Sequence, residues 1–431
     1  MRADDLFAEG LRHHRNGELQ RASECYSRAL AVRPDHFLAL NNAALIAWDF
    51  GRIEMALTLL CEAKKYAPTD REILKNLAGV QVKLEDYAGA EAHLRLALQS
   101  AGEDNPLKLE LATVLSECDK LDEAKSILDK LQYESEVQVP ALFKLGVLNT
   151  RLGNSRDAIS CYSRILEIEG KNVGALNQLA DQHLLLGRPN DALPFLEQSI
   201  GIETSNSRAL SLLAVAFNLL GDRRALLELY SAELYLVETS ISVPDGFQNI
   251  TQFNEKLLAG VEQHAQMRED SPNRATVGGL QSRSISAIPD AAMENLNALF
   301  MAATRDMSIN CKKFPQHPFS RGVPERYKLE SWMVRLQDGG FQRPHNHPAG
   351  WLSGCYYLQV PEVVGQSASQ AGYLEFGRPD EIYQIQDPLI IQSYCPAPGK
   401  LVTFPSFYWH KTIPFEAAEE RICIAFDIRP Y

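Results

Sequence analysis

A repeat of 34 residues in the first half of the chain constrains its fold more than any other feature. Three series of positions keep this period over six or seven units without an insertion. The first series consists of Ala22, Ala56, Ala90, Ala124, Ala158 and Ala192; the second of Gly10, Ala44, Ala78, Ala112, Gly146, Ala180 and Ala214; and the third of Gly17, Gly51, Glu85, Asp119, Gly153, Gly187 and Gly221. A fixed period of this length is typical of a stacked array of one supersecondary unit.

The residue types in these series explain how each unit would fold. Small residues at facing positions let two antiparallel helices approach closely, and glycine can end the first helix in the turn between them. An aromatic or leucine side chain follows the first series by four residues, as at Tyr26 and Leu60. A single helix pair cannot bury its own apolar face, so neighbouring pairs are expected to stack.

Over about residues 3–225 the pattern resembles the tetratricopeptide repeat (TPR). The resemblance implies an all-α solenoid whose concave face binds a protein or peptide partner. The alternative is that the solenoid only spaces or dimerises the protein. Periodicity fades after Gly221, and residues 222–240 are expected to form a last helix that caps the array. We therefore predict two domains, a TPR solenoid at residues 1–229 and a second domain at residues 230–431.

The second domain begins with helices and continues as short strands. We expect helices at about 251–266 and 289–305, separated by a polar loop at 270–288. Runs of β-branched and aromatic residues then alternate with proline and glycine turns. Strands are expected near residues 327–336, 352–360, 372–376, 389–394, 400–404 and 421–428. This many short strands indicates a barrel or jelly-roll.

Three histidines in this half form a candidate metal site. His345 and His347 lie two residues apart between two prolines, and side chains at this spacing point the same way on an extended segment. His410 follows an apolar strand. Neutral imidazole suits Fe, Zn, Cu or Ni. A lone histidine such as His317 is instead expected to be a packed or hydrogen-bonded side chain.

Arg421 opens the strand that follows His410 and can face the same cavity. An arginine that points into a barrel needs a counter-charge, and a dicarboxylate would pair with both of its nitrogens. The alternative is a surface ion pair with Glu419 or Glu420.

Residues 325–431 resemble the 2-oxoglutarate/Fe(II)-dependent dioxygenases. The motifs that carry the resemblance are His-Asn-His-Pro at 345–348, Ser-Gly-Cys-Tyr-Tyr-Leu-Gln-Val-Pro at 353–361, Gly-Tyr-Leu-Glu-Phe at 372–376, Pro-Gly-Lys-Leu-Val-Thr-Phe-Pro at 398–405, His410 and Glu-Arg-Ile at 420–422. The implied fold is a double-stranded β-helix (jelly-roll) with flanking helices, which makes the whole chain an α + β multidomain protein. The implied ligands of Fe(II) are His345, His347 and His410. Arg421 would bind 2-oxoglutarate, and Tyr357 and Ser353 could reach it. His347 is a departure, because most of the superfamily has Asp or Glu there.

The resemblance implies an enzyme, a dioxygenase that hydroxylates a protein or peptide side chain presented by the TPR domain. Two alternatives stay open: a non-catalytic TPR scaffold with a degenerate oxygenase barrel, and a small-molecule oxygenase. A cupin-like metal barrel is disfavoured because no Glu lies three or four residues after His347. An amidohydrolase is also disfavoured, because its strands would alternate with helices.

Composition narrows the partners and the compartment. The formal net charge of −12 argues against nucleic acid as the main partner. Eight cysteines are scattered without a CxxC pair, which is typical of a reducing compartment. No apolar stretch has the length of a membrane span, and the charged N-terminal segment has no apolar core. We expect a cytoplasmic protein without a membrane partner.

Overall fold

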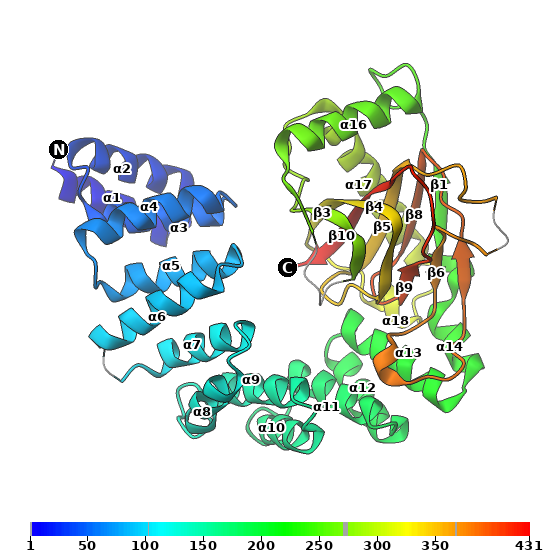
Figure 1. The fold of residues 1–431 in the computed structure, drawn as a ribbon, viewed down its shortest axis with the longest axis horizontal. Helices are drawn as coiled ribbons and strands as arrows, with labels where there is room; N and C mark the ends of the chain where they lie inside the picture. Colours follow the sequence, from blue (N-terminus) through cyan, green and yellow to red (C-terminus); the bar gives the residue numbers. More distant parts are fainter. Residues whose placement is uncertain (1, 102, 270–274, 367–368) are drawn as a thin grey trace. The chain divides into compact units, whose positions relative to one another are not determined.

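The computed structural model describes residues 2–101, 103–269, 275–366 and 369–431 (Figure 1). The chain divides into two compact units, Met1–Ile168 and Glu169–Tyr431. The first unit consists of helices packed as antiparallel pairs. Their bounds are α1 (Ala3–Arg15), α2 (Leu19–Val32), α3 (Phe37–Asp49), α4 (Ile53–Tyr66), α5 (Arg71–Lys83), α6 (Tyr87–Ala101), α7 (Asn105–Glu117), α8 (Leu121–Leu131), α9 (Gln138–Arg151) and α10 (Ser155–Ile168).

The three sequence series occupy equivalent places in every helix pair. All six alanines of the first series are fully buried. All seven residues of the third series have positive φ at the turn between the paired helices, including Glu85 at 64° and Asp119 at 60°. Glycine tolerates this left-handed conformation best, which explains why it fills the other five places. The predicted helical repeat is therefore confirmed.

In six helix pairs the second-series residue is a small residue that faces a larger side chain. That larger side chain is the aromatic or leucine residue four positions after the first-series alanine, and the sizes of the two residues are matched. A Cβ atom on Gly10 would lie 2.7 Å from the Tyr26 ring, and one on Gly146 would lie 2.5 Å from the Tyr162 ring. In four other pairs alanine is combined with a buried leucine, as in Ala44 with Leu60 and Ala78 with Leu94. In these six helix pairs the helices thus keep their spacing by exchanging volume between two positions 16 residues apart, whereas the last pair combines Ala214 with the buried Tyr230.

The second unit begins with two further helix pairs of the repeat: α11 (Val173–Leu185) with α12 (Pro189–Ile202), and α13 (Ser207–Leu220) with α14 (Arg223–Tyr230). The expected single helix over 222–240 is wrong. Ser231 takes a left-handed conformation with φ of 41°, a short α15 (Ala232–Tyr235) follows, and β1 (Val237–Ser240) leaves the helices to pair with the sheet. The predicted boundary at 229/230 falls inside this compact unit, before the last residue of α14.

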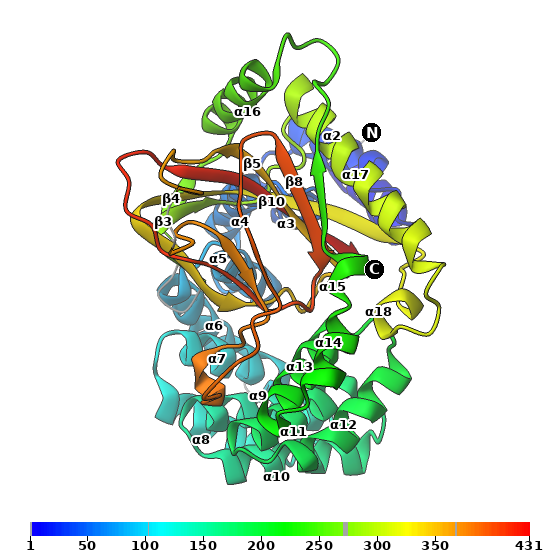
Figure 2. The ribbon, with the colours of Figure 1, turned by 90° about the vertical axis from the view of Figure 1, so that its right-hand side faces the viewer.

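An antiparallel sheet forms the rest of the second unit and curves into a half-barrel (Figures 1 and 2). Its central order is β1-β8-β5-β10-β4-β9-β6-β7, and β3 joins β2 to β4. The remaining bounds are β2 (Met267–Glu269), β3 (Thr276–Ser282), β4 (Tyr327–His345), β5 (Leu352–Gln359), β6 (Leu374–Phe376), β7 (Gln392–Tyr394), β8 (Lys400–Pro405), β9 (His410–Thr412) and β10 (Arg421–Pro430). The predicted α + β architecture, a helical solenoid followed by a jelly-roll-like β domain, is confirmed.

Two features of the sheet differ from the sequence prediction. Strand β4 does not end at the glycines near residue 339; it pairs with β10 up to Leu336 and then, after bulges, with β9 from Gln342. Part of the expected loop at 270–288 is strand β3, and residues 270–274 lie outside the described residues. The two glycines of β3 made this segment resemble a loop in the sequence. Gly279 has no room for a side chain, because a Cβ atom there would lie 2.4 Å from the Arg335 carbonyl oxygen.

Two helices cover the outer face of the half-barrel, close to their predicted positions: α16 (Ile250–His264) and α17 (Ala291–Cys311). Asn254 of α16 accepts a hydrogen bond from the Tyr356 hydroxyl and donates one to the Leu358 carbonyl. Phe300 of α17 stacks on Phe426. Side chains alternate along a strand, so the neighbours of these outward-facing residues point to the inner face.

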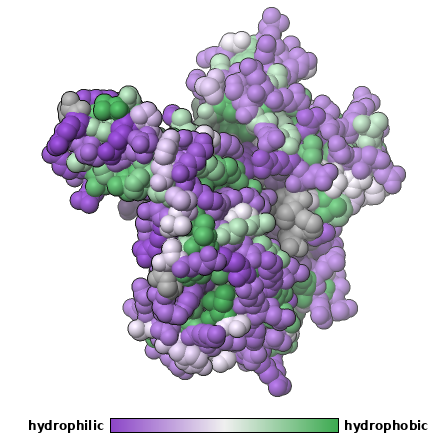
Figure 3. Space-filling view, turned by 60° about the vertical axis from the view of Figure 1, so that its left-hand side comes forward, coloured by the Kyte–Doolittle hydropathy of each residue, from purple (hydrophilic) through white to green (hydrophobic). Residues whose placement is uncertain are grey.

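The chain has a mostly hydrophilic face and free thiols. Hydrophilic residues predominate on the face drawn in Figure 3, with hydrophobic residues in scattered patches. Among the described residues, no helix combines the length and apolar character needed to span a bilayer. All eight cysteines are free thiols.

Candidate metal centre

His345, His347 and His410 converge on the inner face of the half-barrel. His345 and His410 face each other on β4 and β9, with ring centroids 4.2 Å apart. His347 lies on the turn after β4, where its backbone N–H donates to the Ser406 carbonyl at 2.9 Å. One nitrogen from each ring lies within 4.8 Å of the others. The structure thus brings together all three predicted metal ligands.

Each histidine is oriented through its Nδ1 atom. Nδ1 of His345 lies 2.7 Å from the Arg343 carbonyl oxygen, and Nδ1 of His410 lies 2.9 Å from the Tyr408 carbonyl oxygen. Nδ1 of His347 lies 2.6 Å from a carboxylate oxygen of Asp427. These acceptors favour the tautomer with a proton on Nδ1, which leaves the Nε2 lone pair of each ring for a metal ion.

Two of the three rings, those of His345 and His410, are held in their neutral form. Burial, and then the neighbouring His347, lowers the pKa of His345 to about 4. Burial also holds the pKa of His410 well below its ordinary value, with further contributions from His345 and His347. Neutral imidazole is the form that binds metal, so these two ligands are ready at neutral pH. The donor set therefore fits a divalent transition metal.

The buried carboxylate of Asp427 lies on the Nδ1 side of the His347 ring. Asp427 of β10 is 2% exposed and also accepts a hydrogen bond from the Ser353 hydroxyl at 2.7 Å. Burial acts to raise the pKa of Asp427, but the contacts from His347 and Ser353 outweigh it and lower the pKa below its ordinary value. Asp427 is thus an ionised group in the interior. Sequence analysis missed it, although it is the acidic residue of β10 and shares the strand face of Arg421.

Arg421 is buried on the same inner face, with 1% of its surface exposed. Its guanidinium donates to the Gly372 carbonyl at 3.1 Å and to the Tyr357 hydroxyl at 3.3 Å, and it lies over the Tyr357 ring. Within the described part of the chain, no carboxylate forms an ion pair with it. Glu420, the partner expected on the alternative interpretation, is instead bound by Arg335 at 2.5 Å, so that alternative is wrong.

The other two predicted cosubstrate residues lie in different places. Tyr357 contacts Arg421 directly. Ser353 instead contacts Asp427, His347 and Ser406, at 2.7, 3.1 and 2.7 Å. Among the described residues, the hydrogen bonds of Ser353 are thus with groups on the Nδ1 side of His347. The expected contact of Ser353 with the cosubstrate stays a prediction.

Helix α13 of the last repeat holds both histidine-bearing segments. The Ser207 hydroxyl donates to the Gly350 carbonyl, three residues after His347. The Ser211 carbonyl accepts from the Trp409 indole N–H at 2.9 Å. In addition, the Tyr408 hydroxyl donates to the backbone carbonyl of Tyr230 at the end of α14. The positions of His347 and His410 therefore depend on residues of the repeat.

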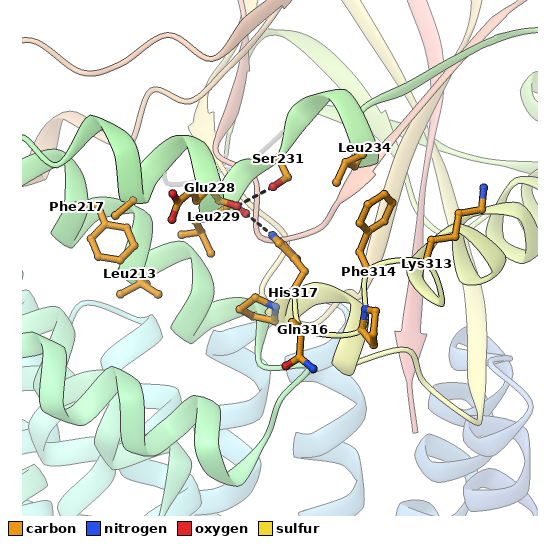
Figure 4. A pocket seen from close by; sticks show the side chains of 13 residues that line it. Leu213, Phe217, Glu228, Leu229, Ser231, Leu234, Lys313, Phe314, Gln316 and His317 are labelled. Atoms are coloured by element: carbon orange, nitrogen blue, oxygen red, sulfur yellow. Dashed lines mark hydrogen bonds between the residues drawn. The ribbon is translucent and has the colours of Figure 1, made fainter.

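An apolar groove of about 680 Å³ lies between α13, α14 and residues 313–318, and none of the three metal-site histidines lines it (Figure 4). His317 is on its wall, where its Nε2 atom lies 3.0 Å from the Leu229 carbonyl oxygen. Its Nδ1 atom accepts from the Phe319 backbone N–H at 3.2 Å. The prediction that His317 is a hydrogen-bonded structural side chain is confirmed.

Two family models match separate parts of the chain. Residues 330–427 match the family described as "Putative 2OG-Fe(II) oxygenase", and residues 7–68 match the tetratricopeptide repeat. A comparison with curated proteins finds no match.

The similar solved structures include proteins described as tetratricopeptide repeat proteins. A tetratricopeptide repeat protein from Parabacteroides merdae is 17% identical with a TM-score of 0.47, covering 53% of this chain and 90% of that one. YrrB, described as a TPR protein with an unusual peptide-binding site, is 21% identical with a TM-score of 0.36 over 44% of this chain and 97% of that one. PilF of Pseudomonas aeruginosa is 18% identical with a TM-score of 0.40 over 46% and 91%. The chain thus joins tetratricopeptide repeats to a domain of the "Putative 2OG-Fe(II) oxygenase" family.

Proposed function

We propose that the chain is a 2-oxoglutarate- and Fe(II)-dependent dioxygenase that hydroxylates a protein or peptide side chain presented by its TPR domain. One observation carries the proposal: the buried guanidinium of Arg421 has no carboxylate partner among the described residues, and it shares the inner face of the half-barrel with three convergent histidines. Arginine is always charged, and a buried charge without a partner is costly. A ligand with a carboxylate supplies the missing partner.

Each side chain of the site has its own role in the proposed reaction. His345, His347 and His410 would hold Fe(II) through their Nε2 atoms. Arg421 and the Tyr357 hydroxyl would bind the carboxylate of 2-oxoglutarate that is remote from the metal. Iron together with 2-oxoglutarate supplies the oxidation of a substrate C–H bond by dioxygen, with succinate and carbon dioxide as co-products. Phe376 and Phe404, whose rings lie 6.0 and 4.8 Å from that of His410, keep this region apolar.

A macromolecular substrate is proposed because the last two helix pairs of the repeat, α11 to α14, share one compact unit with the histidines. Ser207 and Ser211 of α13 hold the segments that carry His347 and His410. Tyr383, from the loop after β6, donates to Asp181 of α11 at 2.7 Å. A partner bound to exposed parts of α11 or α13 would therefore contact helices that support the metal site. Because all thiols are free, we also propose a cytoplasmic location.

A second candidate function is a non-catalytic scaffold that binds metal and cosubstrate without turnover. The observation that favours it is His347, which makes all three metal ligands neutral. A small-molecule oxygenase is the third candidate.

Succinate formation distinguishes these candidates. The assay contains purified protein, Fe(II), 2-oxoglutarate and ascorbate, with and without cell lysate, followed by mass spectrometry for proteins that gain one oxygen atom. The proposal expects succinate that depends on Fe(II) and on Arg421, and a stimulated, oxidised protein in the lysate. Turnover with small molecules alone favours the third candidate. No turnover in wild type, together with turnover in His347→Asp, would show that the natural protein is a scaffold.

A further inference from the structure

The three histidines differ in the groups behind them. His345 and His410 face backbone carbonyls two residues earlier in their own segments. His347 faces the carboxylate of Asp427, which lies 80 residues later on the central strand β10. Asp427 is paired in register with Ser353 of β5, whose hydroxyl donates to the same oxygen. Among the three rings, His347 is thus the one whose Nδ1 atom faces a side-chain carboxylate.

We propose that Asp427 is a positioning residue that supplies the metal centre, through His347, with the negative charge that the histidine itself lacks. This inference rests on the proposed function, because it concerns the same three histidines. Asp427 is too far back to be a ligand together with His347, since the imidazole ring lies between it and the Nε2 atom. Its effect is therefore exerted through the hydrogen bond to Nδ1.

The geometry supports this role in two ways. A short hydrogen bond of 2.6 Å to a buried carboxylate fixes the tautomer and the ring orientation of His347, and it increases the electron density at the opposite nitrogen. Gly350 leaves room for this arrangement, because a Cβ atom there would lie 2.5 Å from the Ser406 hydroxyl and 3.5 Å from the Asp427 carboxylate carbon. The chain thus leaves no room for a side chain at residue 350 beside Ser406, whose hydroxyl lies 2.7 Å from that of Ser353.

Cobalt binding to the full-length protein tests the proposal. Co(II) serves as the probe because its visible spectrum reports the ligand field, and its affinity is measured by competition with a chelator. His410→Ala identifies the site in wild type. Asp427→Asn keeps the side-chain size and an acceptor oxygen but removes the charge, and Asp427→Glu retains the charge. The matched control is Glu91→Gln, which neutralises another buried carboxylate, one in α6 of the first unit that is paired with Lys120 at 2.7 Å.

The expected result is a loss of cobalt affinity of about 10- to 100-fold in Asp427→Asn, with an altered spectrum at saturation. Asp427→Glu is expected to recover most of the affinity, and Glu91→Gln to leave affinity and spectrum unchanged. Wild-type affinity and spectrum in Asp427→Asn would overturn the proposal while leaving the metal site intact. A wild-type protein that binds no cobalt would overturn both this proposal and the proposed function.

Ser353→Ala decides the matter if Asp427→Asn does not fold. This variant removes the Ser353 hydroxyl, which donates to the Asp427 carboxylate. The hydrogen bond between Asp427 and His347 stays. With fewer donors the carboxylate acts more strongly on His347, so cobalt affinity is expected to equal or exceed that of wild type. A tenfold or larger loss would show that the serine network, and not the charge of Asp427, supports the ligand, and would overturn the proposal.

Discussion

Replacing Gly146 with alanine tests the packing rule of the helical repeat. The new Cβ atom would lie 2.5 and 2.6 Å from two ring carbons of Tyr162, a side chain that is fully buried. Neither helix can yield without disturbing its neighbours, and overpacking of this kind costs about 1–3 kcal/mol. Alanine's better helix propensity returns roughly 0.5–1 kcal/mol, so we expect a net destabilisation of about 0.5–2 kcal/mol.

A double-mutant cycle separates this clash from other effects. Tyr162→Leu alone leaves a cavity and is expected to destabilise by about 2 kcal/mol. The double variant recreates the alanine–leucine combination found at Ala112 and Leu128. It should therefore be more stable than the sum of the single changes predicts, with a coupling energy of about 1–3 kcal/mol.

The assay is urea unfolding of the full-length chain, followed by hydrogen–deuterium exchange in peptides from α9 and α10. Gly201→Ala in α12 is the matched control, because a Cβ atom there would meet nothing within 4 Å. That control should be neutral or slightly stabilising. The reasoning is refuted if Gly146→Ala behaves like Gly201→Ala, or if the two changes at 146 and 162 are additive.

Three further predictions follow from the second unit. His410→Ala should lower metal content well below one ion per chain, as measured by inductively coupled plasma mass spectrometry, while a wild-type content would contradict the site. Residues 169–431 alone should give a cooperative melt, whereas residues 231–431 should aggregate because Trp409 loses its partner Ser211; equal melts would contradict this dependence. The metal-free protein should lose stability to urea as pH falls from about 6.5 to about 4, because the unfolded state protonates His345 before the folded state does. In the same urea titrations His345→Gln should lose less stability over this pH range.

The repeat and the histidines could be predicted because their signals are local or periodic. The 34-residue series identified residues that are buried or at turns in every helix pair, and the two-residue spacing of His345 and His347 placed them on one extended segment. What could not be predicted depends on register between distant strands. Asp427 meets His347 only because β10 pairs with β5, and no spacing in the sequence shows this pairing.

The strands that sequence analysis missed are short or rich in glycine. β1 and β9 have four and three residues, which is too few for a clear alternation. β1 also follows directly on a helix of the repeat, so its position was interpreted as helical. The dependence of the histidine segments on α13 could not be foreseen either, because it rests on contacts between Ser211 and Trp409, nearly 200 residues apart.

The central claim is that Arg421 binds 2-oxoglutarate beside a metal held by three histidines. Calorimetric titration of 2-oxoglutarate into anaerobic, Fe(II)-loaded protein tests it most directly. Arg421→Met should keep its metal yet bind 2-oxoglutarate at least about 100-fold more weakly, since removing one partner of a buried charge pair typically costs several kcal/mol. The matched control is Arg335→Met, whose guanidinium binds Glu262 and Glu420 and whose loss should leave the affinity unchanged. Equal affinity for 2-oxoglutarate in wild type and Arg421→Met would contradict the account.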